Sequence, residues 1–172
     1  MSEPKQRSAK PSGLAPRAAR PADLPRIWEL VNALAVYERL EHCVTGTREQ
    51  LGALLFGGDD AFECRVVEHD GRIVGYFLCY TRYSSFRVRR RLWLEDLFVD
   101  PGARGTGAGR VLLQELARLA LERGCDRVDW DVLDWNQLAI DFYHRQGGAE
   151  IAREWLQFGM DEAALRELAE KR

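Results

Sequence analysis

Leu94-Glu-Asp-Leu-Phe-Val-Asp-Pro-Gly-Ala-Arg-Gly-Thr-Gly-Ala-Gly-Arg110 is the stretch that decides the fold of this chain. Its apolar start predicts a strand over 92–99, Pro101-Gly102 predicts a tight turn, and a helix should follow over about 108–123. The alternating glycines of the loop leave backbone N–H groups open where that helix begins, and the positive end of the helix dipole points the same way. This junction is therefore suited to binding a phosphate group.

Two familiar phosphate loops do not fit the spacing. A Walker loop needs lysine and then serine or threonine after its last glycine, whereas arginine and valine follow Gly109 here. A dinucleotide fingerprint that starts at Gly105 needs a glycine at position 110, where this chain has arginine. The remaining pattern, Arg104-Gly-Thr-Gly-Ala-Gly109, resembles the loop with which the GNAT N-acetyltransferases hold the pyrophosphate of acetyl-coenzyme A. A plain helix-start loop is the structural alternative.

Length and composition fit one well-buried domain. The chain has 172 residues, 46% of them hydrophobic, and its 25 basic and 27 acidic residues give a net charge of −2. This balance does not argue for a nucleic-acid or membrane partner. No apolar run approaches the roughly 20 residues of a membrane span, and no signal-peptide core is visible. We therefore expect a cytoplasmic protein.

Cysteines and histidines give no metal-binding pattern. The four cysteines contain no Cys-x-x-Cys pair, and the three histidines have no ligand spacing to them or to each other. Three of the cysteines lie in apolar segments, where reduced and buried thiols are common. We expect no metal ion in this protein.

The periodicity along the chain predicts a mixed α/β (α+β) architecture. Residues 1–13 are polar and should form a mobile tail, and 14–172 should form a single domain. We expect strands at about 14–20, 62–68, 72–80, 92–99, 127–133, 151–153 and 155–160. We expect helices at about 21–39, 47–56, 108–123, 137–146 and 162–169. The result is a central, mostly antiparallel twisted sheet of six to seven strands flanked by helices.

Four blocks of sequence extend the resemblance. They are 94–99, 104–109, Asp134-Trp-Asn136 and Ile140-Asp-Phe-Tyr-His-Arg-Gln-Gly147. Together they resemble the diamine (spermidine/spermine-type) N-acetyltransferase branch, over a region from Arg17 to Phe158. The resemblance implies a homodimer that transfers acetyl from acetyl-coenzyme A directly to a primary amine of a small molecule. A lysine-like amino acid or a di- or polyamine would be the acceptor. A non-catalytic acyl-coenzyme A-binding or regulatory domain is the alternative.

The same resemblance assigns a cofactor site. It implies that the backbone of Leu97, Phe98 and Val99 binds the pantetheine arm and that Asn136 hydrogen-bonds it, with a helix N-cap as the other role open to Asn136. It implies that Tyr143 also contacts the cofactor. The residues that would hold the pyrophosphate are Arg104, Gly105, Thr106, Gly107, Ala108, Gly109 and Arg110.

Acetyl transfer to an amine needs a base and an acid. An alkyl amine of pKa near 10.4 is mostly protonated at pH 7, which costs about 4.6 kcal/mol. Glu95 is the candidate base because a charge in mid-strand needs a function or a partner; a salt bridge is the alternative. Strand alternation points Asp96 to the opposite face, so we expect only one of the two to serve the pocket. The resemblance makes Tyr143 the candidate acid, with ordinary aromatic packing as its alternative.

The amine itself should meet acidic and aromatic residues. Tyr37 and Glu38 match a pair that lines the amine site in the family, and the resemblance implies that Glu95 contacts the amine. Asp129 and Asp131 share one face of the predicted strand at 127–133 and could add to an anionic pocket. A solvated strand face is the alternative for these two.

One departure from the family pattern concerns specificity. Polyamine-acetylating members carry an acidic residue before the central strand, where this chain reads Ser84-Ser-Phe-Arg-Val-Arg-Arg-Arg91. With Arg82, this segment holds five arginines, which would repel a polycation and attract a carboxylate. A zwitterionic amine would suit it better than spermidine. A solvated basic edge that discourages strand-to-strand aggregation is the alternative.

Overall fold

The computed structural model describes residues 13–58, 62–151 and 158–170. They form two compact units, the first ending at Asp134 and the second beginning at Trp135. The tail expected over 1–13 falls almost wholly outside the described residues. The expectation of a single domain over 14–172 stays a prediction.

The first unit contains one sheet. Its strands are β1 (Ala15–Ala18), β2 (Glu63–His69), β3 (Arg72–Ser84), β4 (Arg89–Val99) and β5 (Val128–Asp129). They lie side by side in chain order, the first four antiparallel and β5 parallel to β4. The mostly antiparallel sheet is confirmed. The strand count of six to seven is wrong, because the described residues hold five.

The difference in strand count comes from the C-terminal half. The strand expected over 127–133 is reduced to β5, which pairs with β4 at two positions. The hairpin expected at 151–153 and 155–160 falls mainly on residues 152–157, outside the described residues, and the described residues beside it are not in a strand.

The helices follow the sequence pattern closely. In the first unit they are α1 (Leu24–Glu38), α2 (Arg48–Phe56) and α3 (Ala108–Glu122), and in the second α4 (Gln137–Arg145) and α5 (Glu162–Glu170). Short 3-10 turns occur at Pro21–Asp23, Glu41–Cys43 and Pro101–Ala103. Thr47 and Gln50 form a reciprocal capping box at the start of α2. Because these signals are local, the sequence alone located them.

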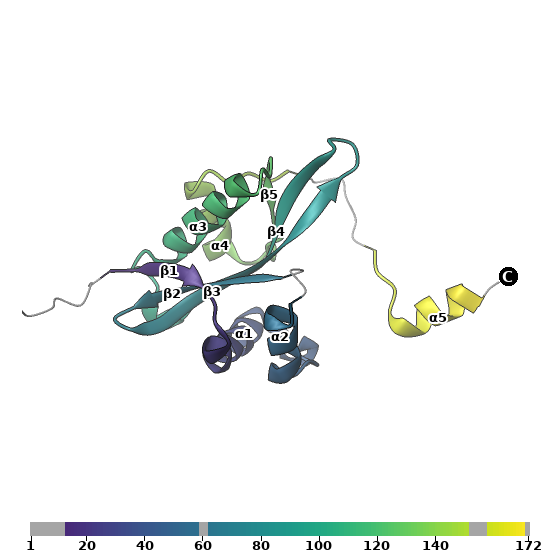
Figure 1. Ribbon diagram of the computed structural model, residues 1–172, viewed down its shortest axis with the longest axis horizontal. Helices are drawn as coiled ribbons and strands as arrows, with labels where there is room; N and C mark the ends of the chain where they lie inside the picture. Colours follow the sequence, from purple (N-terminus) through teal and green to yellow (C-terminus); the bar gives the residue numbers. More distant parts are fainter. Residues whose placement is uncertain (1–12, 59–61, 152–157, 171–172) are drawn as a thin grey trace, which may run out of the picture. The chain divides into compact units, whose positions relative to one another are not determined.

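The sheet of the first unit separates two apolar cores. α3 covers one face, and α1 with α2 covers the other, as Figure 1 shows. Leu112 and Leu116 of α3 are fully buried against Phe77 of β3, while Ile27 and Leu30 of α1 pack with Tyr76. Both faces of the central strands are therefore apolar, which explains the near-continuous hydrophobic run of β3.

The hairpin of β3 and β4 is longer than the apolar runs predicted. Pairing continues beyond Tyr80 to Ser84 opposite Arg89, so the arginine-rich segment forms the outer arm of a hairpin. Phe86 and Val88 at its tip are almost fully exposed. Val88 has a φ of 49°, a left-handed conformation that a β-branched residue adopts only under constraint. The arm carries few apolar residues, and the hydrophobic pattern therefore ended too early to reveal it.

Gly75 allows β3 and β4 to approach closely. A Cβ atom at this position would lie 2.8 Å from the carbonyl oxygen of Phe98 and 3.3 Å from Leu112. A bulge in the pairing of β2 with β3 lies directly beside it. The glycine is thus explained by backbone contact, a common reason for a glycine inside a strand.

We expect Gly75→Ala to destabilise the protein by about 1–3 kcal/mol, because the new methyl group would push against a backbone carbonyl that cannot rotate away. Urea unfolding followed by circular dichroism measures the change. Gly13→Ala is the matched control, since a Cβ there meets no atom within 4 Å. Equal stability of the two variants would contradict the close-approach explanation.

Candidate active site

A β-bulge in β4 organises the candidate site. Leu78 lies opposite Asp96, but the next residue of β3, Cys79, lies opposite Leu94. Glu95 is therefore the extra residue of β4, with no counterpart on β3. Such a bulge interrupts the strict alternation of side chains. The residues that follow it therefore point to the opposite face from the one that a regular strand would give them.

The bulge brings Glu95 and Asp96 to the same face of the sheet. The Glu95 carboxylate accepts a hydrogen bond from Trp93 Nε1 at 2.9 Å, and the Asp96 carboxylate accepts one from Tyr76 at 3.0 Å. Tyr76 belongs to the core beneath α1, and Trp93 pairs with Tyr80 on that same face. The expectation that alternation separates the two acids is therefore wrong, because it assumed a regular strand.

Asp96 is an unexpected acid of this site. Burial raises the pKa of its carboxyl to about 6, the hydrogen bond from Tyr76 lowers it, and the negative charges of Glu95 and Glu38 raise it further. The sequence carried a signal for it. Leu92 and Leu94 pack against α3, as do Leu97 and Val99, so the apolar pattern changes parity between 94 and 97.

Glu38 completes a cluster of three acids, which we call the carboxylate cluster: Glu38, Glu95 and Asp96. Glu38 ends α1, is half-buried, and has its pKa raised by burial. Its charge acts on Asp96 and on Tyr76. Negative charges in each other's field are costly unless a cation joins them. The part of the chain that the structure describes places no arginine in an ion pair with Glu95, which was the alternative to a catalytic role.

Arg104 links the glycine loop to this face. Its guanidinium lies 4.8 Å from the centre of the Tyr37 ring and 5.9 Å from that of Phe98. Tyr37 precedes Glu38 on α1, so the predicted phosphate-binding and amine-binding residues meet here. A guanidinium stacked on aromatic rings is held in place while its N–H groups stay available to an anion.

The glycine loop has the geometry of an anion site. Gly105 and Gly107 have φ values of 82° and 95°, and Gly107 is the N-cap of α3. A Cβ atom at Gly105 would meet nothing within 4 Å, so the surface above the loop is open. Thr106 closes the turn by donating to the carbonyl of Ala103 at 2.7 Å. The first N–H groups of α3 have no partner within the helix and lie next to this loop, an arrangement that suits a pyrophosphate.

At the end of β4 the side chains pack into the two cores, and the backbone groups remain for a ligand. Phe98 is buried toward α1, and Leu97 and Val99 pack toward α3, so only their backbone groups can serve a ligand. β5 pairs with β4 at Leu92 and Trp93, and among the described strands none continues the pairing beyond that point on this side. The edge there can accept an extended amide chain, and the residues present fit the pantetheine arm predicted from the sequence.

The two aspartates expected in the amine pocket differ. Asp129 is buried and is held by Arg91 at 3.4 Å and by Arg127 at 3.1 Å, so its charge is already matched. Asp131 is exposed, and its charge acts on Tyr80 together with that of Glu95. Asp131 is thus on the side of the carboxylate cluster, whereas Asp129 holds β5 against β4. Their contact with the amine stays a prediction.

The remaining predicted residues belong to the second unit. Asn136 is buried and caps α4, with its side chain accepting a hydrogen bond from the backbone of Ala139 at 3.3 Å. The cap role foreseen for it is confirmed, and its role toward the cofactor stays a prediction. Tyr143 lies on α4, half-buried, with its ring centre 5.3 Å from that of Phe142.

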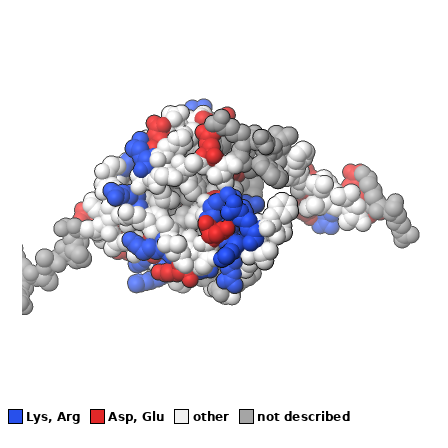
Figure 2. All heavy atoms as spheres, turned by 90° about the horizontal axis from the view of Figure 1, so that it is seen from above, with Lys and Arg blue, Asp and Glu red and all other residues white. Residues whose placement is uncertain are grey.

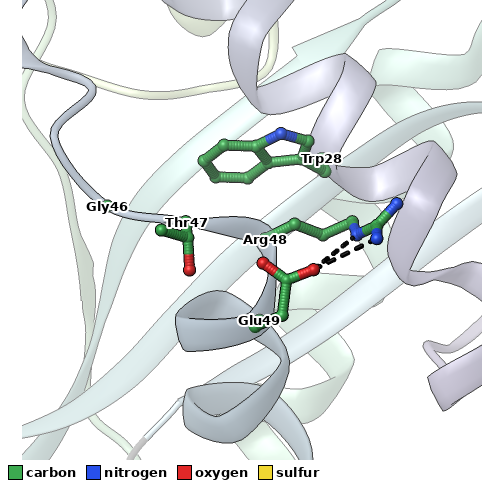
Figure 3. Close-up of a pocket in the computed structure, with 5 residues that line it drawn as sticks. All are labelled: Trp28, Gly46, Thr47, Arg48 and Glu49. Carbon is green, nitrogen blue, oxygen red and sulfur yellow. Dashed lines mark hydrogen bonds and ion pairs between the residues drawn. The ribbon is translucent and has the colours of Figure 1, made fainter.

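Other surface features do not contain the predicted residues. An open pocket at the start of α2 is lined by Trp28 and residues 46–49, where Arg48 and Glu49 pair with each other (Figure 3). On the face drawn in Figure 2, basic and acidic side chains lie side by side. Within the described residues there is no group of His, Cys, Asp and Glu that could hold a metal ion, and no helix long and apolar enough to cross a membrane.

Comparison with known proteins identifies the family. Residues 25–148 match the model of the acetyltransferase (GNAT) family, which spans parts of both units. Mouse thialysine N-epsilon-acetyltransferase is 36% identical, over 89% of this chain and 95% of its own. An L-ornithine N5-acetyltransferase of Arabidopsis thaliana is 29% identical, over 81% and 80%. A solved acetyltransferase of Trypanosoma brucei is 26% identical with a TM-score of 0.68, over 87% and 99%.

The raised pKa of Asp96 has a consequence for stability. The folded protein binds the Asp96 proton more tightly than the unfolded chain, whose carboxyl has a pKa of about 3.9. Stability therefore falls as the pH rises from about 4 to 6, and Asp96→Asn removes this loss. We expect the stability gained by Asp96→Asn to be about 2 kcal/mol larger at pH 7.5 than at pH 4.5. Urea unfolding at both pH values measures it, and an equal effect at both would contradict it.

Proposed function

Because this chain belongs to the GNAT family and is an N-acetyltransferase, we propose that it transfers acetyl from acetyl-coenzyme A directly to a primary amine of a small molecule. The acceptor would be a lysine-like amino acid or a di- or polyamine. The observation that carries this proposal is the carboxylate cluster on the face that Arg104 and the glycine loop also reach. An ammonium group is the ligand that relieves the repulsion of such a cluster.

The cofactor would bind along β4 and the glycine loop. Backbone groups of Leu97, Phe98 and Val99 would hold the pantetheine arm, and residues 104–110 the pyrophosphate. Gly105 and Gly107 support this role because their left-handed conformations keep the loop open, and Arg104 supports it because its charge lies beside the loop. Bound acetyl-coenzyme A would supply an activated acetyl group as a thioester.

Glu95 would act as the base. Its carboxylate is exposed, is positioned by Trp93, and lies at a bulge, where a side chain leaves the regular surface of the sheet. The incoming ammonium first binds among the negative charges of the carboxylate cluster and then passes a proton to Glu95, directly or through water. The free amine can then attack the acetyl carbon. Tyr37 would line the same pocket through its ring.

Tyr143 would act as the acid, donating its phenolic proton to the sulfur that departs and regaining one from solvent. This role is supported by the Phe142-Tyr143 pair on the helix that Asn136 caps, a context that resembles that of the family's tyrosine. Asn136 would also hydrogen-bond the pantetheine arm. A homodimer in the cytoplasm is part of the same proposal, and sedimentation as a concentration-independent monomer would remove the dimer from it.

Initial-rate release of coenzyme A across an amine panel tests the proposed function. The panel would hold lysine, thialysine, spermidine, putrescine, small alkyl amines and a lysine-containing peptide. We expect release with at least one small primary amine above the rate of hydrolysis without amine. Binding of acetyl-coenzyme A with no transfer to any acceptor would instead support the binding-domain alternative.

We expect Glu95→Gln and Tyr143→Phe each to lower kcat by about 100-fold or more, the range that a positioned acid or base contributes. The dissociation constant of coenzyme A, measured by calorimetry, should stay within about threefold of the wild type, because the phosphate-binding loop is unchanged. Matched controls are Glu122→Gln at the exposed end of α3 and Tyr83→Phe on the exposed hairpin arm. Full activity in either test variant would refute the role assigned to that residue.

A further inference from the structure

Trp93 contacts two side chains of opposite charge on the face of the sheet that holds the carboxylate cluster. Its indole N–H donates to Glu95 at 2.9 Å, and the guanidinium of Arg82 lies 4.4 Å from its ring centre. Arg82 pairs with Arg91 and Tyr80 pairs with Trp93, so strand alternation puts all four side chains on one face. A cation and an anion thus flank one rigid aromatic ring.

The electrostatics of Tyr80 agree with this arrangement. Burial and the charge of Glu95 raise the pKa of its phenol, the charge of Arg82 lowers it, and the charge of Asp131 raises it. One side chain therefore lies within electrostatic reach of both signs. Along this face the potential changes from negative at the bulge to positive on the hairpin arm.

Arg82 is stacked on Trp93 and, unlike Arg87 and Arg91, is not in an ion pair among the residues that the structure describes. Arg91 is paired with Asp129, and Arg87 lies 3.6 Å from Asp126. Arg82 is exposed and has no carboxylate partner among the residues that the structure describes. Stacking on Trp93 fixes the plane of its guanidinium, while the N–H groups at its rim remain open to a planar anion.

We propose that Arg82, held on Trp93, binds the α-carboxylate of a zwitterionic amino acid whose side-chain ammonium enters the carboxylate cluster. Arg82 is then a specificity-determining residue that selects diamino acids over polyamines. This inference rests on the proposed function, because it names the acceptor of the same reaction. The guanidinium fork matches a carboxylate with two parallel hydrogen bonds, which no group of a polyamine can accept.

The size of the acceptor fits the distance. In an extended lysine-like side chain the carboxylate carbon lies roughly 7–8 Å from the terminal nitrogen, given C–C bonds of about 1.5 Å. The guanidinium of Arg82 lies over the face of the Trp93 ring, 4.4 Å from its centre, and the carboxylate of Glu95 lies at the N–H edge of the same ring, 2.9 Å from Nε1. Both charges thus contact one side chain, and an extended diamino acid of this length matches such a separation of its carboxylate and ammonium groups.

The test compares lysine with cadaverine, which lacks only the carboxylate. We expect Arg82→Gln to lower kcat/KM for lysine at least about tenfold, mainly through KM, and to leave the value for cadaverine within about twofold or raise it. Arg82→Lys keeps the positive charge but loses the forked guanidinium, so its kcat/KM for lysine should fall between those of the wild type and Arg82→Gln. Arg90→Gln is the matched control, an exposed arginine of the same arm that pairs with Tyr83 on the opposite face.

Each other outcome is decisive. Equal losses with lysine and cadaverine in Arg82→Gln, or the same loss in Arg90→Gln, would overturn the role of Arg82 while leaving acetyl transfer intact. A wild-type protein that acetylates cadaverine but not lysine would overturn the inference and keep the proposed function. Transfer to neither amine, nor to any other member of the panel, would overturn both.

Discussion

The single extra residue in β4 is the constraint on which the candidate site depends. If β4 were regular, Asp96 and Phe98 would project toward α3, into an apolar core with no partner for a carboxylate. The bulge at Glu95 sends both toward α1, where Tyr76 supplies a hydrogen bond and Glu38 lies within electrostatic reach. One change of register thus places two carboxylates side by side on the α1 face of the sheet.

The three acids of the carboxylate cluster place negative charges close together. Two acids of the carboxylate cluster are held by neutral donors, Asp96 by the phenol of Tyr76 and Glu95 by the indole of Trp93, and among the described residues neither is in an ion pair with an arginine. Several other acids of the first unit are matched by cations: Asp23 binds Arg17, and Asp100 binds Arg26. The contrast explains why the cluster is suited to a cationic ligand, since the ligand supplies the charge that the protein withholds.

The glycine loop and the bulge are close in the sequence, but only the loop can be recognised readily from the sequence. The loop depends on neighbouring residues alone. Gly105 and Gly107 take left-handed conformations that other residues avoid, and their spacing from the helix can be seen in the sequence. The bulge is a relation between two strands, fixed by how Leu78 and Cys79 lie opposite β4. In the sequence it leaves only a change of parity in the apolar residues after Leu94.

The sequence by itself determined the family, the helices, the capping box at Thr47 and the glycine loop before α3, because each of these structural signals depends on neighbours within a few residues. The tertiary structure alone decided that Asp96 joins Glu95, that Asp129 is neutralised by arginines, and that the arm beyond Tyr80 is a paired hairpin. These features depend on pairing and desolvation between distant segments, and a pattern along one segment does not encode its partner.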